Sequence, residues 1–146
     1  MSRFELPRDL SFNTEKVADP TSFARDRRAA SWLYLNGEEF AAMEGGISYA
    51  QVERAVGRSL NVISDPPRVL DLDLARRHVA ALDELPRPTL VTCRTGPRAS
   101  AVTYMYSGLR AGAAAGDVAQ RRPFLQVRRL QAVGARVYRD AAARRG

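Results

Sequence analysis

Cysteine, histidine and lysine each occur only once in this chain of 146 residues. The single cysteine, Cys93, excludes a disulfide within the chain and a metal cluster built on several thiolates. One histidine, His78, is too few for the usual zinc-ligand sets. We therefore expect no metal and no cofactor, and a reduced thiol of the kind found in the cytoplasm.

The sequence also lacks long apolar runs. No stretch approaches the about 18 apolar residues of a membrane-spanning helix, and residues 1–7 lack the apolar core of a signal peptide. We expect a cytoplasmic protein with no membrane partner. The length and the 45% hydrophobic content fit one domain over residues 1–146, with 1–9 and 140–146 as flexible tails.

Basic charge is concentrated in the second part of the chain. The net charge is +7, and residues 94–146 hold eleven arginines against two aspartates, a net charge of +9. A basic face attracts phosphorylated substrates, nucleic acid or acidic surfaces alike. The arginine and alanine bias also fits a GC-rich coding genome. We favour this explanation for the arginines outside the cysteine loop. Nucleic acid is not an expected partner, because aromatic residues are not interleaved with the basic ones.

Strand-like and helix-like segments alternate along the chain. Apolar runs predict strands over 32–35, 60–63 and 89–92, and helices are predicted from Asp19, over 49–56 and over 73–85. His78 falls on the apolar stripe of the last of these and is interpreted as a core residue. This order indicates an α/β fold with a small, mostly parallel central sheet flanked by helices.

The most informative segment is residues 88–100. A buried strand runs into Cys93, a loop with Gly96 follows, and a helix rich in alanine is predicted to begin at Ala99. Such a junction directs several backbone N–H groups at one small space, which suits an anion. A cysteine there is expected to be a nucleophilic thiolate. The alternative is a small buried hydrophobe, but Gly96 and the flanking Arg94 and Arg98 favour an anion site.

Residues 92–100, which read Thr-Cys-Arg-Thr-Gly-Pro-Arg-Ala-Ser, resemble the signature loop of cysteine-dependent phosphatases. The resemblance is strongest to the bacterial phosphatase-like domain of β-lactamase hydrolase-like proteins, formerly a domain of unknown function, whose loop commonly reads Cys-Arg-Ser-Gly-Thr-Arg-Ser. It implies a protein tyrosine phosphatase-like fold that is all-helical after the loop. Two positions depart from the tyrosine phosphatase pattern: Thr92 replaces histidine, and Arg98 follows the cysteine by five positions instead of six.

The resemblance implies a mechanism and a set of site residues. Cys93 would attack phosphorus to form a phosphocysteine, while Arg98 and the loop N–H groups hold the phosphoryl oxygens. Ser100 would hydrogen-bond the sulfur and assist its departure. The partner is then a phosphorylated substrate or another small anion, and the oligomeric state is left open. The implied substrate-binding residues are Arg94, Thr95, Gly96, Pro97, Ala99 and Ser100.

A general acid is needed to protonate the leaving oxygen, and Asp65 is the candidate. Dual-specificity-like phosphatases place this aspartate in a loop after the preceding strand, and Asp65 lies 28 residues before Cys93, ahead of two prolines. An equally supported interpretation is that Asp65 ends a strand and caps a turn. Asp71 and Asp73 are weaker candidates, the first as a solvated charge and the second as a helix N-cap.

Three functions remain in competition. The first is a phosphatase that uses a phosphocysteine. The second is a rhodanese-like sulfurtransferase that carries a persulfide on Cys93, since a short loop with arginines at its first and fifth positions also resembles rhodaneses. The third is a non-catalytic phosphate-binding module. Rhodaneses typically show an acidic-arginine strand and a Gly-His-Ile-type segment before the cysteine, and neither occurs in this sequence. This difference and the helical pattern after Cys93 favour the phosphatase-like fold.

Overall fold

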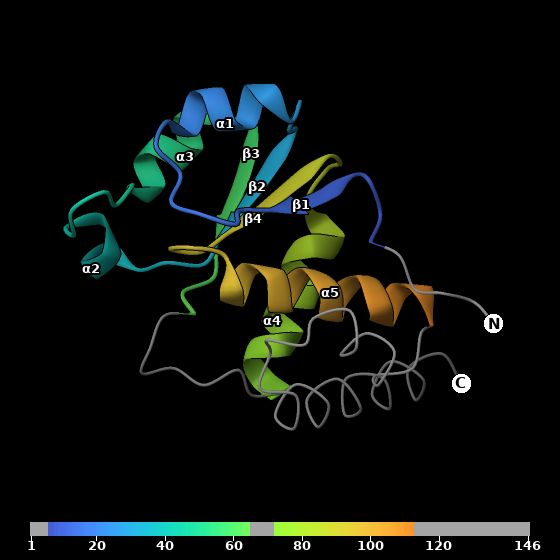
Figure 1. The fold of residues 1–146 in the computed structure, drawn as a ribbon. Helices are drawn as coiled ribbons and strands as arrows, with labels where there is room; N and C mark the ends of the chain where they lie inside the picture. Colours follow the sequence, from blue (N-terminus) through green and yellow to red (C-terminus); the bar gives the residue numbers. More distant parts are fainter. Residues whose placement is uncertain (1–5, 65–71, 113–146) are drawn as a thin grey trace.

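The computed structural model describes residues 6–64 and 72–112, and these form a parallel sheet between two layers of helices. Figure 1 shows α1 and α3 on one face of the sheet and α4 and α5 on the other. The described elements are β1 (Leu10–Phe12), α1 (Pro20–Asp26), β2 (Ser31–Tyr34), α2 (Glu38–Ala41), α3 (Tyr49–Ala55), β3 (Arg58–Asn61), α4 (Leu72–Glu84), β4 (Thr89–Thr92) and α5 (Pro97–Ala111).

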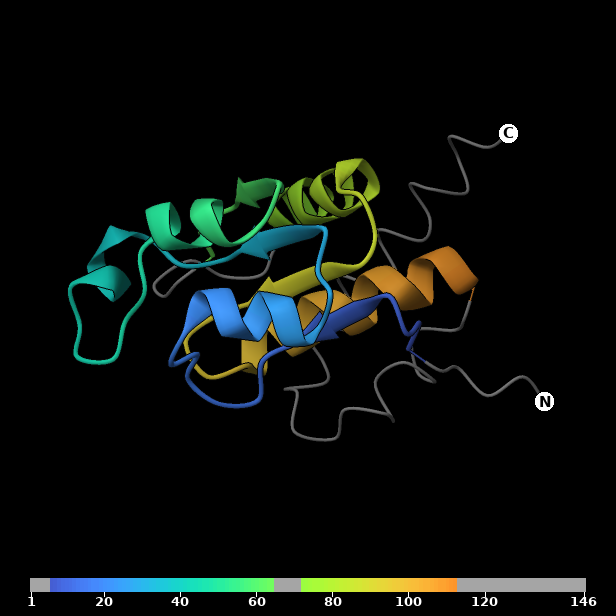
Figure 2. The same cartoon turned by 90° about the horizontal axis from the view of Figure 1, so that it is seen from above.

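The strand order is β1-β4-β2-β3, and each neighbouring pair is parallel. This confirms the predicted α/β fold with a small parallel sheet, and it places β4 in the interior of the sheet. Figure 2, seen from above, looks onto the face of the sheet that α1 and α3 cover. Because all the strands run the same way, their carboxyl ends share one edge, which is where α/β folds bind ligands.

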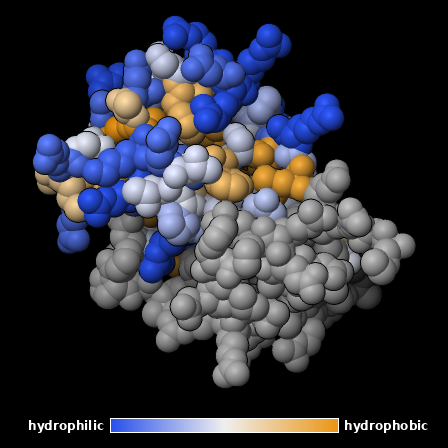
Figure 3. Space-filling model, viewed as in Figure 1, coloured by the Kyte–Doolittle hydropathy of each residue, from blue (hydrophilic) through white to orange (hydrophobic). Residues whose placement is uncertain are grey.

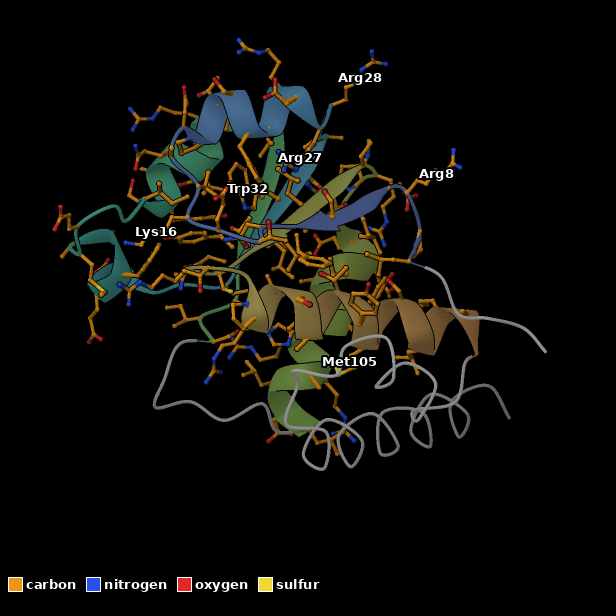
Figure 4. All side chains as sticks on the ribbon, viewed as in Figure 1. Arg8, Lys16, Arg27, Arg28, Trp32 and Met105 are labelled. Atoms are coloured by element: carbon orange, nitrogen blue, oxygen red, sulfur yellow. The ribbon has the colours of Figure 1, made fainter. Side chains whose placement is uncertain are left out.

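Alternate residues of the strands supply the two halves of the core. Trp32 and Tyr34 pack with α1 and α3, whereas Leu33 and Leu35 belong to the cluster on the α4 and α5 side. Figure 4 shows Trp32 on the side of the sheet that α1 covers. Side chains of a strand point alternately to its two faces, so a strand buried on both faces reads as a continuous apolar run.

The strand predicted over 89–92 is confirmed as β4, two other predicted strands are shifted, and one strand was missed. The strands begin at Ser31 and Arg58, earlier than the apolar runs that marked them, because Ser31 pairs in register with both Arg58 and Thr89. Beyond the strand ends, Leu35 still donates its N–H to the Thr92 carbonyl at 3.0 Å. Strand β1 was not predicted because three residues give too little periodicity to detect.

The helices largely follow their sequence signals. Asp19 caps α1 by accepting the N–H groups of Thr21 and Ser22, as predicted. Helix α5 begins at Pro97, two residues before the predicted start, because proline suits the first helical position. The helices predicted after residue 112 lie outside the described residues.

Polar side chains cover much of the described surface. Figure 3 shows hydrophilic groups over the helices at the top of the view, and Met43 is the one exposed large hydrophobic residue in the described ranges. Arg8 and Arg28 extend away from the ribbon in Figure 4. Among the described helices, none has the length and apolar character needed to cross a membrane.

Candidate active site

Cys93 lies directly after β4, at the carboxyl edge of the sheet. Its side chain is buried, with 8% of the residue exposed. Strands β1 and β2 flank β4, so the residues that follow these two strands reach the cysteine from either side. We call residues 93–100 the signature loop.

Two backbone N–H groups of the signature loop donate to the Cys93 sulfur. The N–H of Gly96 lies 3.2 Å from Sγ and that of Ala99 lies 3.4 Å from it. The second donor belongs to the first turn of α5, where N–H groups have no partner within the helix. The two donors therefore hold the sulfur inside the turn of the signature loop.

Gly96 permits the loop to turn back around the sulfur. Its φ of 113° lies in the left-handed region that side-chain-bearing residues avoid. A Cβ at this position would stand 2.0 Å from the backbone oxygen of Asn13. Two features therefore require glycine at position 96: the left-handed backbone conformation and the close approach of the segment that follows β1.

Asn13 holds the signature loop from the side of β1. Its Oδ1 accepts the N–H of Cys93 at 3.2 Å, and its Nδ2 donates to the Cys93 carbonyl at 2.9 Å. The same Nδ2 donates to the Glu15 carbonyl at 2.9 Å. Asn13 is 1% exposed, so water does not replace these bonds. Sequence reasoning missed this residue, and its position just after a strand was the only signal available.

Arg98 lies in the first turn of α5 and is half-buried. Its Nη1 donates to the backbone carbonyl of Ser64 at 2.5 Å. Within residues 6–64 and 72–112, this is the one hydrogen bond of the Arg98 guanidinium. Arg94 and Thr95 are exposed at the rim of the loop.

Ser100 is placed differently from its implied role. It is fully buried, and its backbone N–H donates to the Gly96 carbonyl at 2.8 Å. Its hydroxyl makes no hydrogen bond to any described residue, and so none to the Cys93 sulfur. The predicted contact between the hydroxyl and the sulfur is therefore not present in this arrangement.

Ser64 and His78 form a buried polar pair behind Arg98. Both are 0% exposed, and Ser64 Oγ lies 2.8 Å from His78 Nε2. Burial, together with the nearby positive charges of Arg77 and Arg98, lowers the pKa of His78 to about 4. The imidazole is therefore neutral at pH 7. This confirms that His78 is a core residue, and its bond to Ser64 connects it to the site.

The acidic candidates are only partly described. Asp65 and Asp71 lie outside the described residues. Asp73 is inside α4 and not at its N-cap, because the helix already includes Leu72. No group of three potential metal-ligating side chains occurs in residues 6–64 and 72–112.

The parallel sheet, its two helical layers and the cysteine loop at its carboxyl edge have the fold of the protein tyrosine phosphatase-like phosphatases. No protein-family model and no curated protein matches the sequence. Solved structures do match. A glycine-to-alanine mutant form of Tk-PTP aligns with a TM-score of 0.67 at 14% identity, over 90% of this chain and 91% of its own. The core catalytic domain of the PP-IP phosphatase SIW14 from S. cerevisiae, in complex with citrate, aligns with a TM-score of 0.62 at 12% identity, over 96% of this chain and 90% of its own.

Proposed function

We propose that this protein hydrolyses a phosphate monoester through a phosphocysteine intermediate on Cys93. The observation that carries the proposal is the pair of N–H groups from Gly96 and Ala99 on the Cys93 sulfur, at 3.2 and 3.4 Å. A buried sulfur that accepts two such bonds is prepared as a nucleophile. The phosphatase fold and the guanidinium of Arg98 support the same function.

The first step transfers the phosphoryl group. The thiolate of Cys93 uses an electron pair to form the S–P bond, while the P–O bond to the leaving group breaks. Asp65 is the proposed general acid, and it gives its proton to the leaving oxygen. In the second step water attacks phosphorus, its proton passes to the Asp65 carboxylate, and the S–P bond breaks to regenerate the thiolate and release phosphate.

Stabilisation of the phosphoryl oxygens is assigned to the signature loop. In a loose transition state the negative charge is spread over these oxygens, so donors fixed in advance lower the barrier. Arg98 would supply a planar pair of donors, and the exposed Arg94 would attract the anion at the rim. Pro97 has no N–H group, and its role is to start α5 at the loop. Thr95 is the remaining proposed backbone contact, since the N–H groups of Gly96 and Ala99 donate to the sulfur and that of Ser100 donates to the Gly96 carbonyl.

The finer assignment rests on the motif. We infer that the chain is related to the bacterial phosphatase-like domain of β-lactamase hydrolase-like proteins, because the loop has the same length and the same arginine positions. A phosphorylated substrate is the proposed partner, and the citrate in the SIW14 complex is an anion as well. A thiolate nucleophile also favours the cytoplasm, where cysteine stays reduced.

The test is hydrolysis of p-nitrophenyl phosphate across pH by the wild type, Cys93→Ser and Asp65→Asn proteins. Phosphate release should disappear in Cys93→Ser. In Asp65→Asn the rate should fall about 10²- to 10⁴-fold, the usual contribution of a general acid, and the loss of rate at high pH should disappear. Asp26→Asn, an exposed aspartate at the end of α1, is the matched control and should behave as wild type.

Sulfur transfer from thiosulfate to cyanide, measured on the same samples, separates the alternatives. Thiocyanate formation that depends on Cys93, without phosphate release, would assign the site to a persulfide mechanism. Phosphate binding without either turnover would make the protein a binding module.

A further inference from the structure

The buried pair of His78 and Ser64 joins helix α4 to the signature loop. His78 Nε2 lies 2.8 Å from Ser64 Oγ, and the Ser64 carbonyl accepts the Arg98 guanidinium. The N–H of Ser64 donates to the Leu35 carbonyl at 2.8 Å. Ser64 is thus bound at its side chain and at both of its backbone groups, and each bond comes from a different part of the fold.

The direction of the hydrogen bond between His78 and Ser64 follows from the second bond of the hydroxyl. Ser64 Oγ also lies 2.9 Å from the Val62 carbonyl oxygen, which can only accept. A hydroxyl carries one hydrogen, so this hydrogen goes to Val62 and His78 must donate from Nε2. The neutral ring then carries no hydrogen on Nδ1. That agrees with the absence of any partner for this buried nitrogen within the described residues.

The contact between Ser64 and Arg98 fixes one part of the guanidinium. Arginine has five N–H donors in a planar arrangement. When Nη1 is held by a carbonyl, the Nε and Nη2 donors keep a defined plane and can bind two oxygens of an anion together. A shift of Ser64 would move this plane, and displacements of about 1 Å at a catalytic group are costly.

We propose that His78 is a positioning residue for Arg98. By donating to Ser64 Oγ it fixes the Ser64 carbonyl, and the carbonyl in turn fixes the guanidinium in the orientation that receives the anion. That this anion is a phosphoryl group rests on the proposed function, whereas the positioning of Arg98 does not.

The neutral state of His78 is compatible with this role. Burial holds its pKa at about 4, and the two cations that contribute, Arg77 of α4 and Arg98 of α5, act in the same direction. The ring therefore remains a neutral Nε2–H donor throughout the neutral pH range.

The decisive pair of variants is His78→Gln and His78→Met. Glutamine offers an N–H donor near the place of Nε2, whereas methionine has a similar size and no donor. In the Cys93→Ser background, which has no turnover, the Kd for inorganic phosphate is measured by calorimetry. His78→Gln should stay within about 3-fold of its parent, and His78→Met should weaken binding about 10-fold, the loss of roughly one hydrogen bond. Ser64→Ala, which removes the acceptor and leaves the imidazole, should match His78→Met.

A helix variant separates positioning from general loss of stability. Leu82→Ala removes a fully buried side chain of the same helix α4 that has no bond to Ser64. It should lower the free energy of unfolding by about 2–5 kcal/mol and leave the phosphate Kd unchanged. An equal loss of phosphate affinity in Leu82→Ala would overturn the proposal.

A second readout does not depend on phosphate. The Nε–H resonance of Arg98, assigned by its loss in Arg98→Lys, should show an ordered side chain in the wild type and in His78→Gln. It should show an averaged side chain in His78→Met and Ser64→Ala. If phosphate binds nowhere but this pattern holds, the proposed function fails and the positioning role stands. If phosphate binds to the wild type and neither its Kd nor the Arg98 resonance changes in His78→Met, the positioning role is wrong.

Discussion

Asn13 binds both backbone groups of Cys93, accepting its N–H at 3.2 Å and donating to its carbonyl at 2.9 Å. The cysteine is therefore held by a side chain that lies 80 residues earlier in the chain. The same asparagine leaves space for the loop only because residue 96 is glycine.

Replacement of Asn13 by alanine should impair both stability and catalysis. Two backbone groups of Cys93 would lose their partners in a buried place, at a cost of about 1–3 kcal/mol in the free energy of unfolding. Urea denaturation measures the stability, and p-nitrophenyl phosphate hydrolysis measures the site. Asn61→Ala is the control, because Asn61 donates to the carbonyls of Tyr34 and Asn36 without contacting the loop. A similar loss of activity in this control would show that the effect is not specific to the loop.

Gly96→Ala should abolish activity. The added Cβ would require the loop to move away from Asn13, in addition to a strain of about 1–2 kcal/mol from the left-handed backbone. A displacement near 1 Å predicts a loss of activity of about 10²-fold or more. Gly112→Ala tests the backbone strain alone, because its φ is also positive at 69° and nothing lies within 4 Å of its Cβ. Gly57→Ala should have neither effect. An active Gly96→Ala protein would show that the loop tolerates another path.

Arg98→Lys should weaken phosphate binding while the protein stays folded. Lysine keeps the positive charge but loses the planar pair of donors, so we expect the inhibition constant of inorganic phosphate to rise about 10- to 100-fold. Arg8→Lys is the matched control, because Arg8 is exposed before β1, at the opposite edge of the sheet. Equal inhibition constants for wild type and Arg98→Lys would remove Arg98 from the anion site.

The stability of the protein should fall between about pH 6.5 and pH 4 because of His78. In the unfolded chain histidine binds a proton with a pKa of about 6.5, whereas burial lowers the pKa of His78 to about 4 in the folded protein. Above pH 6.5 the histidine is neutral in both the folded and the unfolded chain. Between about pH 6.5 and pH 4 it gains a proton only in the unfolded chain, which favours unfolding. The free energy of unfolding therefore decreases by about 3 kcal/mol between pH 6.5 and pH 4.

The difference between wild type and His78→Gln in urea denaturation isolates this effect, because glutamine does not titrate. As His78 is the only histidine, its proton resonances can be followed without assignment problems. A titration midpoint near 6.5 in the folded protein would mean that the ring is not buried as described.

The fold class and the course of the cysteine loop were predictable because their signals are local. The apolar run of β4, the glycine at position 96 and the arginines on either side lie within ten residues and together describe one strand, one turn and one helix start. Asp19 was found in the same way, from a capping residue followed by proline.

The supporting contacts could not be predicted because they join distant parts of the chain. Nothing in the residues around Asn13 or Ser64 shows that one meets Cys93 and the other Arg98. His78 looked like an ordinary member of an apolar helical stripe, and only the position of Ser64 gives it a polar partner. Ser100 was wrongly expected to contact the sulfur, because sequence spacing does not give the direction of a side chain at a helix start.

The pairing of β1 with β4 has a consequence for how the protein acquires its site during folding. The first strand cannot enter the sheet until the chain has been made as far as residue 92, since its partner along the whole of its length is β4. Closing so long a segment is slow compared with forming local helices. Asn13 arrives with β1, so the cysteine gains its fixed geometry in the same late event. A chain that has folded only its local helices would lack the contacts between Asn13 and Cys93, so these contacts report completion of the sheet.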